Sequence, residues 1–238
     1  FNRTYYNLGG STIVTGGNLN VNGNVFINSG SFSQSGGTIT VDGNDGSTPG
    51  GSLAAFTDLL YMATTSQNVT GGTILIVDPP FTSTASVFRY FTSSTVIWTG
   101  HTIQLGDGTS TNAGSASPVS LGGVNSFLGF NIITSTSNTG GIRFYNMIVN
   151  GGSGTNRFVT APQFSGSGSF SVGNDLTINS GSELRTLYGP TIGGANINVG
   201  GNIINNGTLV IGPFTTLALR MDGSTASTSP QTISGSGI

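Results

Sequence analysis

The segment Asn18-Leu-Asn-Val-Asn-Gly-Asn24 returns twenty residues later as Thr38-Ile-Thr-Val-Asp-Gly-Asn44. In both copies an apolar residue, a valine, a glycine and an asparagine fall at the same places. An offset of this length is typical of one coil of a parallel β-solenoid, because such a coil buries its apolar side only by stacking on its neighbours. Between the two copies lie 25–30 and 31–37, two short alternating stretches that are each closed by glycine. The sequence therefore predicts about 20 residues per coil, arranged as three short strands and three turns.

A shorter repeat links this region to the C-terminal part of the chain. Ile27-Asn-Ser-Gly-Ser31 recurs unchanged as Ile178-Asn-Ser-Gly-Ser182, and a third copy reads Ile204-Asn-Asn-Gly-Thr208. We interpret the three as equivalent corners of different coils, with Gly or Asn where φ is often positive. Asn side chains at equal positions of stacked coils can form hydrogen-bonded ladders. An antiparallel sandwich is the alternative, but its hairpins do not require a constant offset of twenty residues.

The spacing divides the chain into three regions. Residues 1–45 and 141–238 follow the coil pattern, whereas 46–140 lack the twenty-residue period and are interpreted as an insertion or as irregular, wider coils. A short helix is expected at about 52–63, since Ser52 can cap its first turn and Leu53, Phe56, Leu60 and Ala63 share one face. The predicted fold is all-β, a parallel β-helix with one short helix in its middle region.

Charged residues are scarce. The chain has six basic residues, all of them Arg, and eight acidic residues among 238. Because the arginines are scattered, they form no basic patch for a phosphate backbone, and nucleic acid is not an expected partner. No apolar run reaches the roughly 20 residues of a membrane-spanning helix, so membrane insertion is not expected either. A net charge of −2 leaves little repulsion between copies, which favours self-association.

The residues needed for catalysis or metal binding are sparse. His101 is the one histidine, and a Ser-His-carboxylate arrangement would need partners that the sequence does not place beside it. There is no Cys and no Lys, which removes thiolate metal sites and a phosphate-binding P-loop. Asp42, Asn44 and Asp45 resemble a calcium loop without its distal Glu, and we interpret them as a turn. We expect no catalytic residues, no metal and no cofactor.

Several motifs together resemble a known group of proteins. They are the openers Arg3-Thr-Tyr-Tyr-Asn-Leu8 and Arg143-Phe-Tyr-Asn-Met147, the strand 18–24, the Ile-Asn-Ser-Gly corners and the closing Gln231-Thr-Ile-Ser-Gly-Ser-Gly237. This combination resembles the repetitive β-helical surface proteins of Bacteroidetes-type bacteria, over roughly 1–45 and 141–238. The resemblance implies an exported adhesin or matrix component, often a substrate of type IX secretion. In that group the closing motif commonly runs directly into an aromatic opener.

We therefore expect an extracellular structural protein at the cell surface or in the matrix, stacked end to end on copies of itself in a filament. Neither end of the sequence offers the charged or helical cap with which solenoids protect their edges. The expected assembly interface consists of Phe1, Tyr5, Tyr6, Leu8, Ile233 and Ile238.

Two other functions stay open at this point. One is an adhesin whose residues 46–140 bind glycans or a protein, with Trp98, Tyr61, Tyr90 or Tyr188 stacking on sugar rings. The other is a pectate-lyase-like enzyme that acts on polysaccharides, since those enzymes share the β-helical architecture. Such an enzyme would need acidic calcium ligands and a basic residue gathered on one face.

Overall fold

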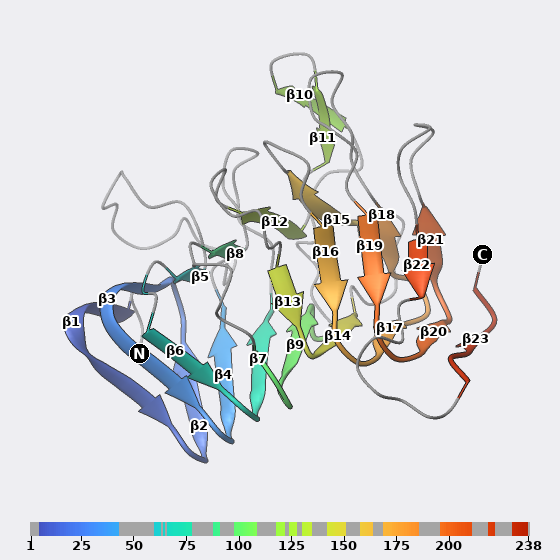
Figure 1. Ribbon diagram of the computed structural model, residues 1–238. Coiled ribbons are helices and arrows are strands. Elements are labelled where there is room, and N and C mark those ends of the chain that lie inside the picture. Colours follow the sequence, from blue (N-terminus) through green and yellow to red (C-terminus); the bar gives the residue numbers. More distant parts are fainter. Residues whose placement is uncertain are drawn as a thin grey trace.

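The fold is all-β in the part of the chain that the structure, a computed structural model, describes. That part comprises residues 5–42, 60–62, 64, 66–77, 88–90, 98–108, 118–121, 124–127, 130–134, 142–150, 158–163, 169–185, 196–210, 219–221 and 230–237. Its strands form three parallel sheets and one antiparallel pair. Figure 1 shows that the chain advances in one direction. Strands β1 and β3 lie at one end, and β22 and β23 lie at the other.

The first sheet has the order β1-β3-β5-β8-β12-β15-β18-β21, and β6 also pairs with β3. Its strands are β1 (Tyr5–Val14), β3 (Val25–Gln34), β5 (Leu60–Met62), β6 (Ser66–Val69), β8 (Phe88–Tyr90), β12 (Phe130–Thr134), β15 (Phe158–Gln163), β18 (Glu183–Arg185) and β21 (Thr208–Val210). The second sheet has the order β2-β4-β7-β9-β14-β17-β20-β23. Its strands are β2 (Asn18–Val21), β4 (Thr38–Val41), β7 (Thr73–Ile76), β9 (Thr102–Leu105), β14 (Asn146–Val149), β17 (Leu176–Ile178), β20 (Ile203–Asn205) and β23 (Ile233–Ser234).

The third sheet is shorter and has the order β13-β16-β19-β22. Its strands are β13 (Ile142–Phe144), β16 (Ser169–Val172), β19 (Asn196–Val199) and β22 (Leu219–Met221). The antiparallel pair consists of β10 (Pro118–Leu121) and β11 (Val124–Phe127). From β13 to β23 every third strand along the chain belongs to the same sheet, so the chain visits the third, second and first sheets in turn.

The repeat that was read from the sequence sets the register of the second sheet. Leu19 pairs with Ile39 and Val21 with Val41, in parallel, as predicted. The same register continues through β7 and β9, where every second residue is buried. Alternation of this kind turns one residue of each pair toward the core and its neighbour toward the outside. One buried cluster results, to which strands of all three parallel sheets contribute.

The predicted repeat of about 20 residues holds between β2 and β4, where Asn18 pairs with Thr38, and not farther along the second sheet. Across the second sheet, side chains at the same corner position are separated by 29 residues from Asn146 to Asp175, 27 from Asp175 to Asn202 and 30 from Asn202 to Thr232. The added residues lie between the strands, so the register of the strands is kept while the connections lengthen. Residues 46–140 also contribute strands to both large sheets. The boundaries predicted at 45/46 and 140/141 stay a prediction.

The repeated pentapeptides do not mark equivalent corners, so this interpretation was wrong. Ile27 lies in β3 of the first sheet and pairs with Met62, whereas Ile178 ends β17 of the second sheet and pairs with Asn205. The third copy is also displaced by one residue, because Ile204 pairs with Thr177. Ile-Asn-Ser-Gly supplies an inward apolar residue followed by turn formers, and those needs are shared by different corners of the chain.

Two predictions of local structure were also wrong. The stretches 25–30 and 31–37 do not form two strands, since β3 runs through Gly30 as one strand. The helix expected at 52–63 fails where it can be compared, because Leu60 and Met62 are buried in strand β5 against Val25 and Ile27. Burial of two residues that are two positions apart is the spacing of a strand and not of a helix. Residues 52–59 and 63 lie outside the described part.

Glycines with positive φ stack at the corner that precedes the second sheet. Gly17, Gly37 and Gly72 have φ of 68°, 71° and 85°. Their carbonyls accept hydrogen bonds from Thr38, Thr73 and Thr102 of the following strand, at 2.9 Å in each case. A Cβ at Gly37 would lie 2.6 Å from the carbonyl oxygen of Gly17, whereas a Cβ at Gly17 would meet nothing within 4 Å. Stacking of backbone on backbone thus excludes a side chain at Gly37.

We expect Gly37→Ala to lower the free energy of unfolding more than Gly17→Ala. Gly17→Ala introduces only the left-handed strain, about 1 to 2 kcal/mol, whereas Gly37→Ala adds a collision with the backbone of Gly16 and Gly17. Gly16→Ala, where the space is open and φ is outside the left-handed region, is the control and should stay within about 0.5 kcal/mol of wild type. Urea unfolding followed by circular dichroism measures all three. Equal losses at Gly17 and Gly37 would contradict the role of stacking.

Candidate assembly surfaces at the two ends of the sheets

The first candidate surface lies on β1, the edge strand of the first sheet. Tyr6, Leu8 and Ile13 are 37%, 69% and 66% exposed. In the paired strand β3, Leu8 is matched by Ser29 and Ile13 by Ser33. Outward positions that are polar in β3 are therefore apolar in the edge strand. An exposed apolar row on an edge strand is a typical site of association, because the strand also offers its backbone for pairing.

Two inward positions of β1 are polar where the paired positions of β3 are apolar. Asn7 pairs with Ile27 and Thr12 with Phe32, and both polar residues are buried. The Asn7 amide donates to the Thr12 hydroxyl at 2.8 Å and to the Gly10 carbonyl at 3.0 Å, while its oxygen accepts from the Gly9 and Gly10 amides. Tyr5 adds a hydroxyl contact with Thr12 at 3.0 Å. This network satisfies buried polar groups and covers part of the apolar core at this end.

The second candidate surface lies on β23, at the opposite edge of the second sheet. Ile233 pairs with Ile203, which is completely buried, yet Ile233 itself is 64% exposed. Its position is that of a core residue with no strand on its other side in the described part of the chain. Removing such a side chain from water is favourable by about 25 cal/mol per Å² of apolar surface. Ile233 therefore provides a driving force for contact.

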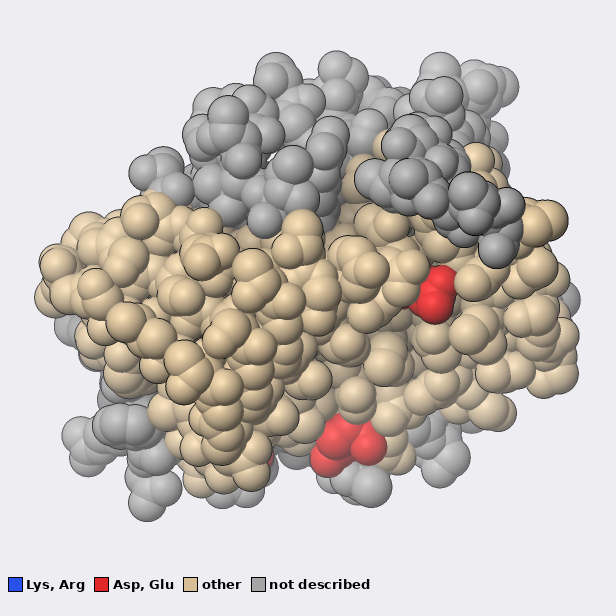
Figure 2. All heavy atoms as spheres, turned by 60° about the horizontal axis from the view of Figure 1, so that its bottom comes forward, with Lys and Arg blue, Asp and Glu red and all other residues tan. Residues whose placement is uncertain are grey.

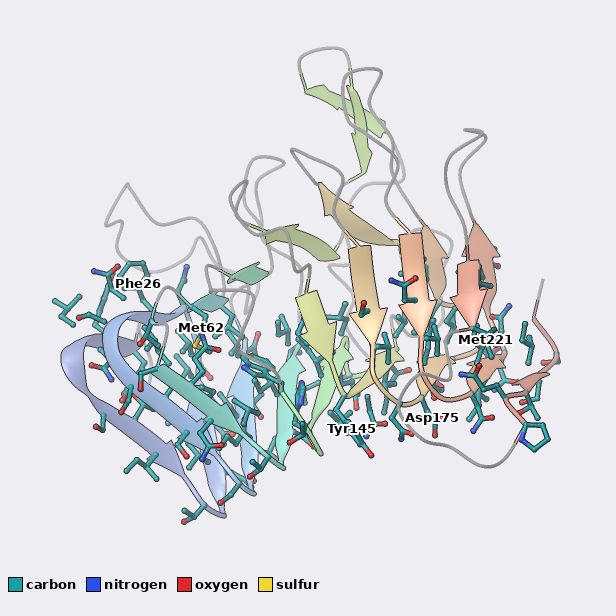
Figure 3. All side chains as sticks on the ribbon, in the orientation of Figure 1. Phe26, Met62, Tyr145, Asp175 and Met221 are labelled. Carbon is teal, nitrogen blue, oxygen red and sulfur yellow. The ribbon has the colours of Figure 1, made fainter. Side chains whose placement is uncertain are left out.

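A ladder of short polar side chains ties β23 to the strands behind it. The Asn146 oxygen accepts from the Asn174 amide at 2.9 Å, and the Asp175 carboxylate accepts from the backbone N–H of Asn202 at 2.7 Å. The Asn202 oxygen in turn accepts from both the backbone N–H and the hydroxyl of Thr232, at 3.0 Å each. In Figure 3, Tyr145 and Asp175 lie at this corner, between Met62 toward one end and Met221 toward the other. A hydrogen-bonded ladder is thus present, but it is mixed: Asp175 and Thr232 alternate with Asn146 and Asn202 in place of the identical Asn side chains that were predicted.

The described surface carries little charge. Figure 2 shows a face that is almost wholly uncharged, with a few separate acidic groups and no basic group among the residues that are coloured. Contacts between copies on such a surface meet little charge repulsion and little cost of removing ions from water.

The structure places the predicted interface residues at two separate ends. Tyr6 and Leu8 are exposed on β1, Tyr5 is half-buried there, and Ile233 is exposed on β23. Phe1 and Ile238 lie outside the described residues. Ile13 was missed by sequence reasoning, although alignment of 11–14 with 31–34 would have set it against Ser33.

Trp98 and His101, two of the residues considered for other functions, lie in the core. Trp98 is 2% exposed, with rings of Phe32, Phe144 and His101 around it, and its indole donates to the Gln67 oxygen at 2.8 Å. A buried indole cannot stack on a sugar, so Trp98 is excluded from the glycan-binding hypothesis. Of the other aromatics considered for that role, Tyr188 lies outside the described residues, and so do the side chains of Tyr61 and Tyr90.

His101 offers no catalytic geometry. It is completely buried, neither ring nitrogen has a hydrogen-bond partner, and its ring lies edge-on to Trp98 with 4.8 Å between centroids. Burial disfavours the charged imidazolium and lowers the pKa of His101 from 6.5 to about 4. No nucleophile or carboxylate is hydrogen-bonded to it, so a triad is not assembled here.

The described residues contain no group of three or more His, Cys, Asp or Glu side chains able to hold a metal ion. Asp42 is half-buried after β4, whereas Asn44 and Asp45 of the same predicted turn lie outside the described part. Among the described residues, no helix has the length and apolar character required to cross a membrane. Comparison of the chain with protein-family models, with curated proteins and with solved structures found no match.

We expect acid to destabilise the protein through His101. Because its pKa is lowered on folding, the neutral form stabilises the folded state fully above pH 6.5, and that stability is lost as the pH falls toward 4. The loss should be on the order of 3 kcal/mol. Urea unfolding at pH 7.5 and pH 4.5 measures it. His101→Leu should reduce the difference between the two pH values, and an unchanged difference would contradict the assignment to His101.

Proposed function

We propose that this chain is an extracellular structural protein that associates end to end with copies of itself. The observation that carries the proposal is the place of the exposed large apolar residues. Every one found among the described residues lies on an edge strand, three on β1 and one on β23. These strands stand at opposite ends of the molecule in Figure 1. Two such surfaces on opposite ends support a head-to-tail contact, which extends indefinitely if it does not close into a ring.

We infer further that the three parallel sheets are successive faces of a β-solenoid. Support comes from the order in which the chain visits them, with every third strand from β13 onward in the same sheet. The parallel pairing and the single buried cluster agree with stacked coils. In a solenoid the stability grows with the number of stacked coils, because each coil contacts only its neighbours. A joint between copies would add one more such contact.

Location at the cell surface or in the matrix is part of the proposal. It is supported by the motif resemblance to repetitive β-helical surface proteins and by a surface wetted by Ser, Thr and Asn. A nearly uncharged rod held by backbone pairing suits a fibre, because exposure to changing salt alters few of its interactions. The proposed partner is a second copy of this chain.

Purified protein should form rods that lengthen with concentration. Analytical ultracentrifugation from about 1 to 500 µM, with negative-stain electron microscopy, measures this over the range in which protein contacts of moderate strength form. Ile233→Arg should shorten or abolish the rods because it places a charge in the proposed contact.

The matched control is Thr177→Arg, which adds the same charge on an interior strand of the second sheet. That variant should form rods like the wild type. A monodisperse monomer at the highest concentration, with correct folding shown by circular dichroism, would contradict the proposal. So would equal effects of the two substitutions.

A further inference from the structure

The two edges of the second sheet, β2 and β23, are complementary in side chains. The inward positions that follow one another across this sheet are Leu19, Ile39, Ile74, Ile103, Met147, Leu176, Ile203 and Ile233. The six interior members are at most 2% exposed, whereas Leu19 is only partly buried and Ile233 is 64% exposed. The column is apolar throughout, and only its two ends retain surface that another strand could cover.

The directions of the backbone N–H and C=O groups also fit a pairing of β23 with β2. In a parallel strand, the N–H and C=O of one residue point to the same side and those of the next residue to the other side. The Thr232 carbonyl accepts from Ile203, so the N–H and C=O of Ile233 point away from β20. The carbonyls of Gly17 and Val21 accept from Thr38 and Asp42 beyond β2. The C=O of Asn18 therefore points to the open side of β2.

From these two observations we propose that copies join with β23 of one against β2 of the next, in parallel, with Ile233 over Leu19. In this register the N–H of Ile233 donates to the C=O of Asn18. The proposal rests on the proposed function, since it names the joint through which end-to-end association occurs. At this joint, each edge strand meets a parallel strand with an apolar inward residue, as it already does on its other side.

Other registers fit less well. A shift of one residue would turn Ile233 outward, because successive side chains of a strand point to opposite faces. A shift of two residues would place Ile233 over Val21, which is already completely buried. Leu19 is the inward residue of β2 that still has surface to bury.

The polar row beside this column continues across the same joint. Asn18, Asn146, Asp175, Asn202 and Thr232 occupy one outward position of the second sheet. In the proposed register the next residue after Thr232 in this row is Asn18 of the following copy. Both side chains are exposed, and their hydroxyl and amide groups can hydrogen-bond as Thr232 and Asn202 do at 3.0 Å.

Cysteine pairs test the register directly, because the chain has no cysteine of its own. Thr232→Cys and Asn18→Cys, made in separate chains and mixed, place thiols on residues that face each other across the joint. Their Cα atoms would be about 4.8 Å apart, within the range of a disulfide. The matched control mixes Thr232→Cys with Asn20→Cys, also an exposed residue, which the register places about 8 Å away. Oxidation under conditions in which the wild type forms rods should give at least ten times more cross-linked dimer with Asn18 than with Asn20.

The outcomes separate the joint from the function. Preferred cross-linking to Asn20, or rods without a cross-link in either mixture, would overturn the register and leave end-to-end association standing. Dimers formed by Asn18→Cys alone would overturn it as well, since they indicate contact between identical edges. Absence of both rods and cross-links at the highest concentration would overturn the proposed function itself.

Discussion

Parallel pairing of backbones in register is the constraint on which the rest of this structure depends. It places each residue beside the residue at the same position of the next strand, so apolar side chains follow one another in columns such as Leu19 to Ile233. It also forces the corners to repeat. Where the corner has positive φ and the backbones lie close, as at Gly37, only glycine fits. Where a side chain can reach the equivalent corner of the next strand, short amides and hydroxyls form ladders, as at Asn202.

The same constraint leaves the ends of the sheets different from their interior. Asn7 and Thr12 replace apolar residues at inward positions of β1, and they satisfy their polar groups within that strand. Toward the other end, Asn205 of β20 takes the inward position that Ile178 occupies in the neighbouring strand β17. Both substitutions reduce the apolar surface that an unpaired end would offer to water. At the two edges of the second sheet, Leu19 and Ile233 are inward apolar residues that keep surface for a neighbouring strand to cover, which is why the joint is assigned there.

The strand pairing was predicted most accurately where the same short sequence pattern occurs in both strands. The match between 18–21 and 38–41 gave the pairing residue by residue, because identical spacing left no room for another alignment. Sequence reasoning failed where turn chemistry was used as a marker of position, as with Ile27 and Ile178, since the same turn residues serve different corners. The helix failed because Leu60 belongs to both a helical and an alternating pattern.

Of the exposed apolar residues on edge strands, sequence reasoning named Tyr6, Leu8 and Ile233 and did not name Ile13. The positions of Leu8 and Ile233 followed from the repeat pattern near the two ends of the sequence. Exposure of Ile13 depends on β1 being an edge strand, which composition alone does not reveal. The burial of Trp98 among Phe32, Phe144 and His101 likewise depends on contacts between strands far apart in the sequence.

The long β1–β3 pairing at the start of the chain has a consequence for how this protein folds. No large sheet contains a hairpin in the described residues, so each strand must wait for a partner many residues away. Loop closure is least costly where the offset is shortest, and that is at β1 with β3 and β2 with β4. We therefore expect these two strand pairs to form first and the later strands to add to them one after another. A chain that leaves a translocation channel with its N-terminus first would thus acquire its structure in the order in which it emerges.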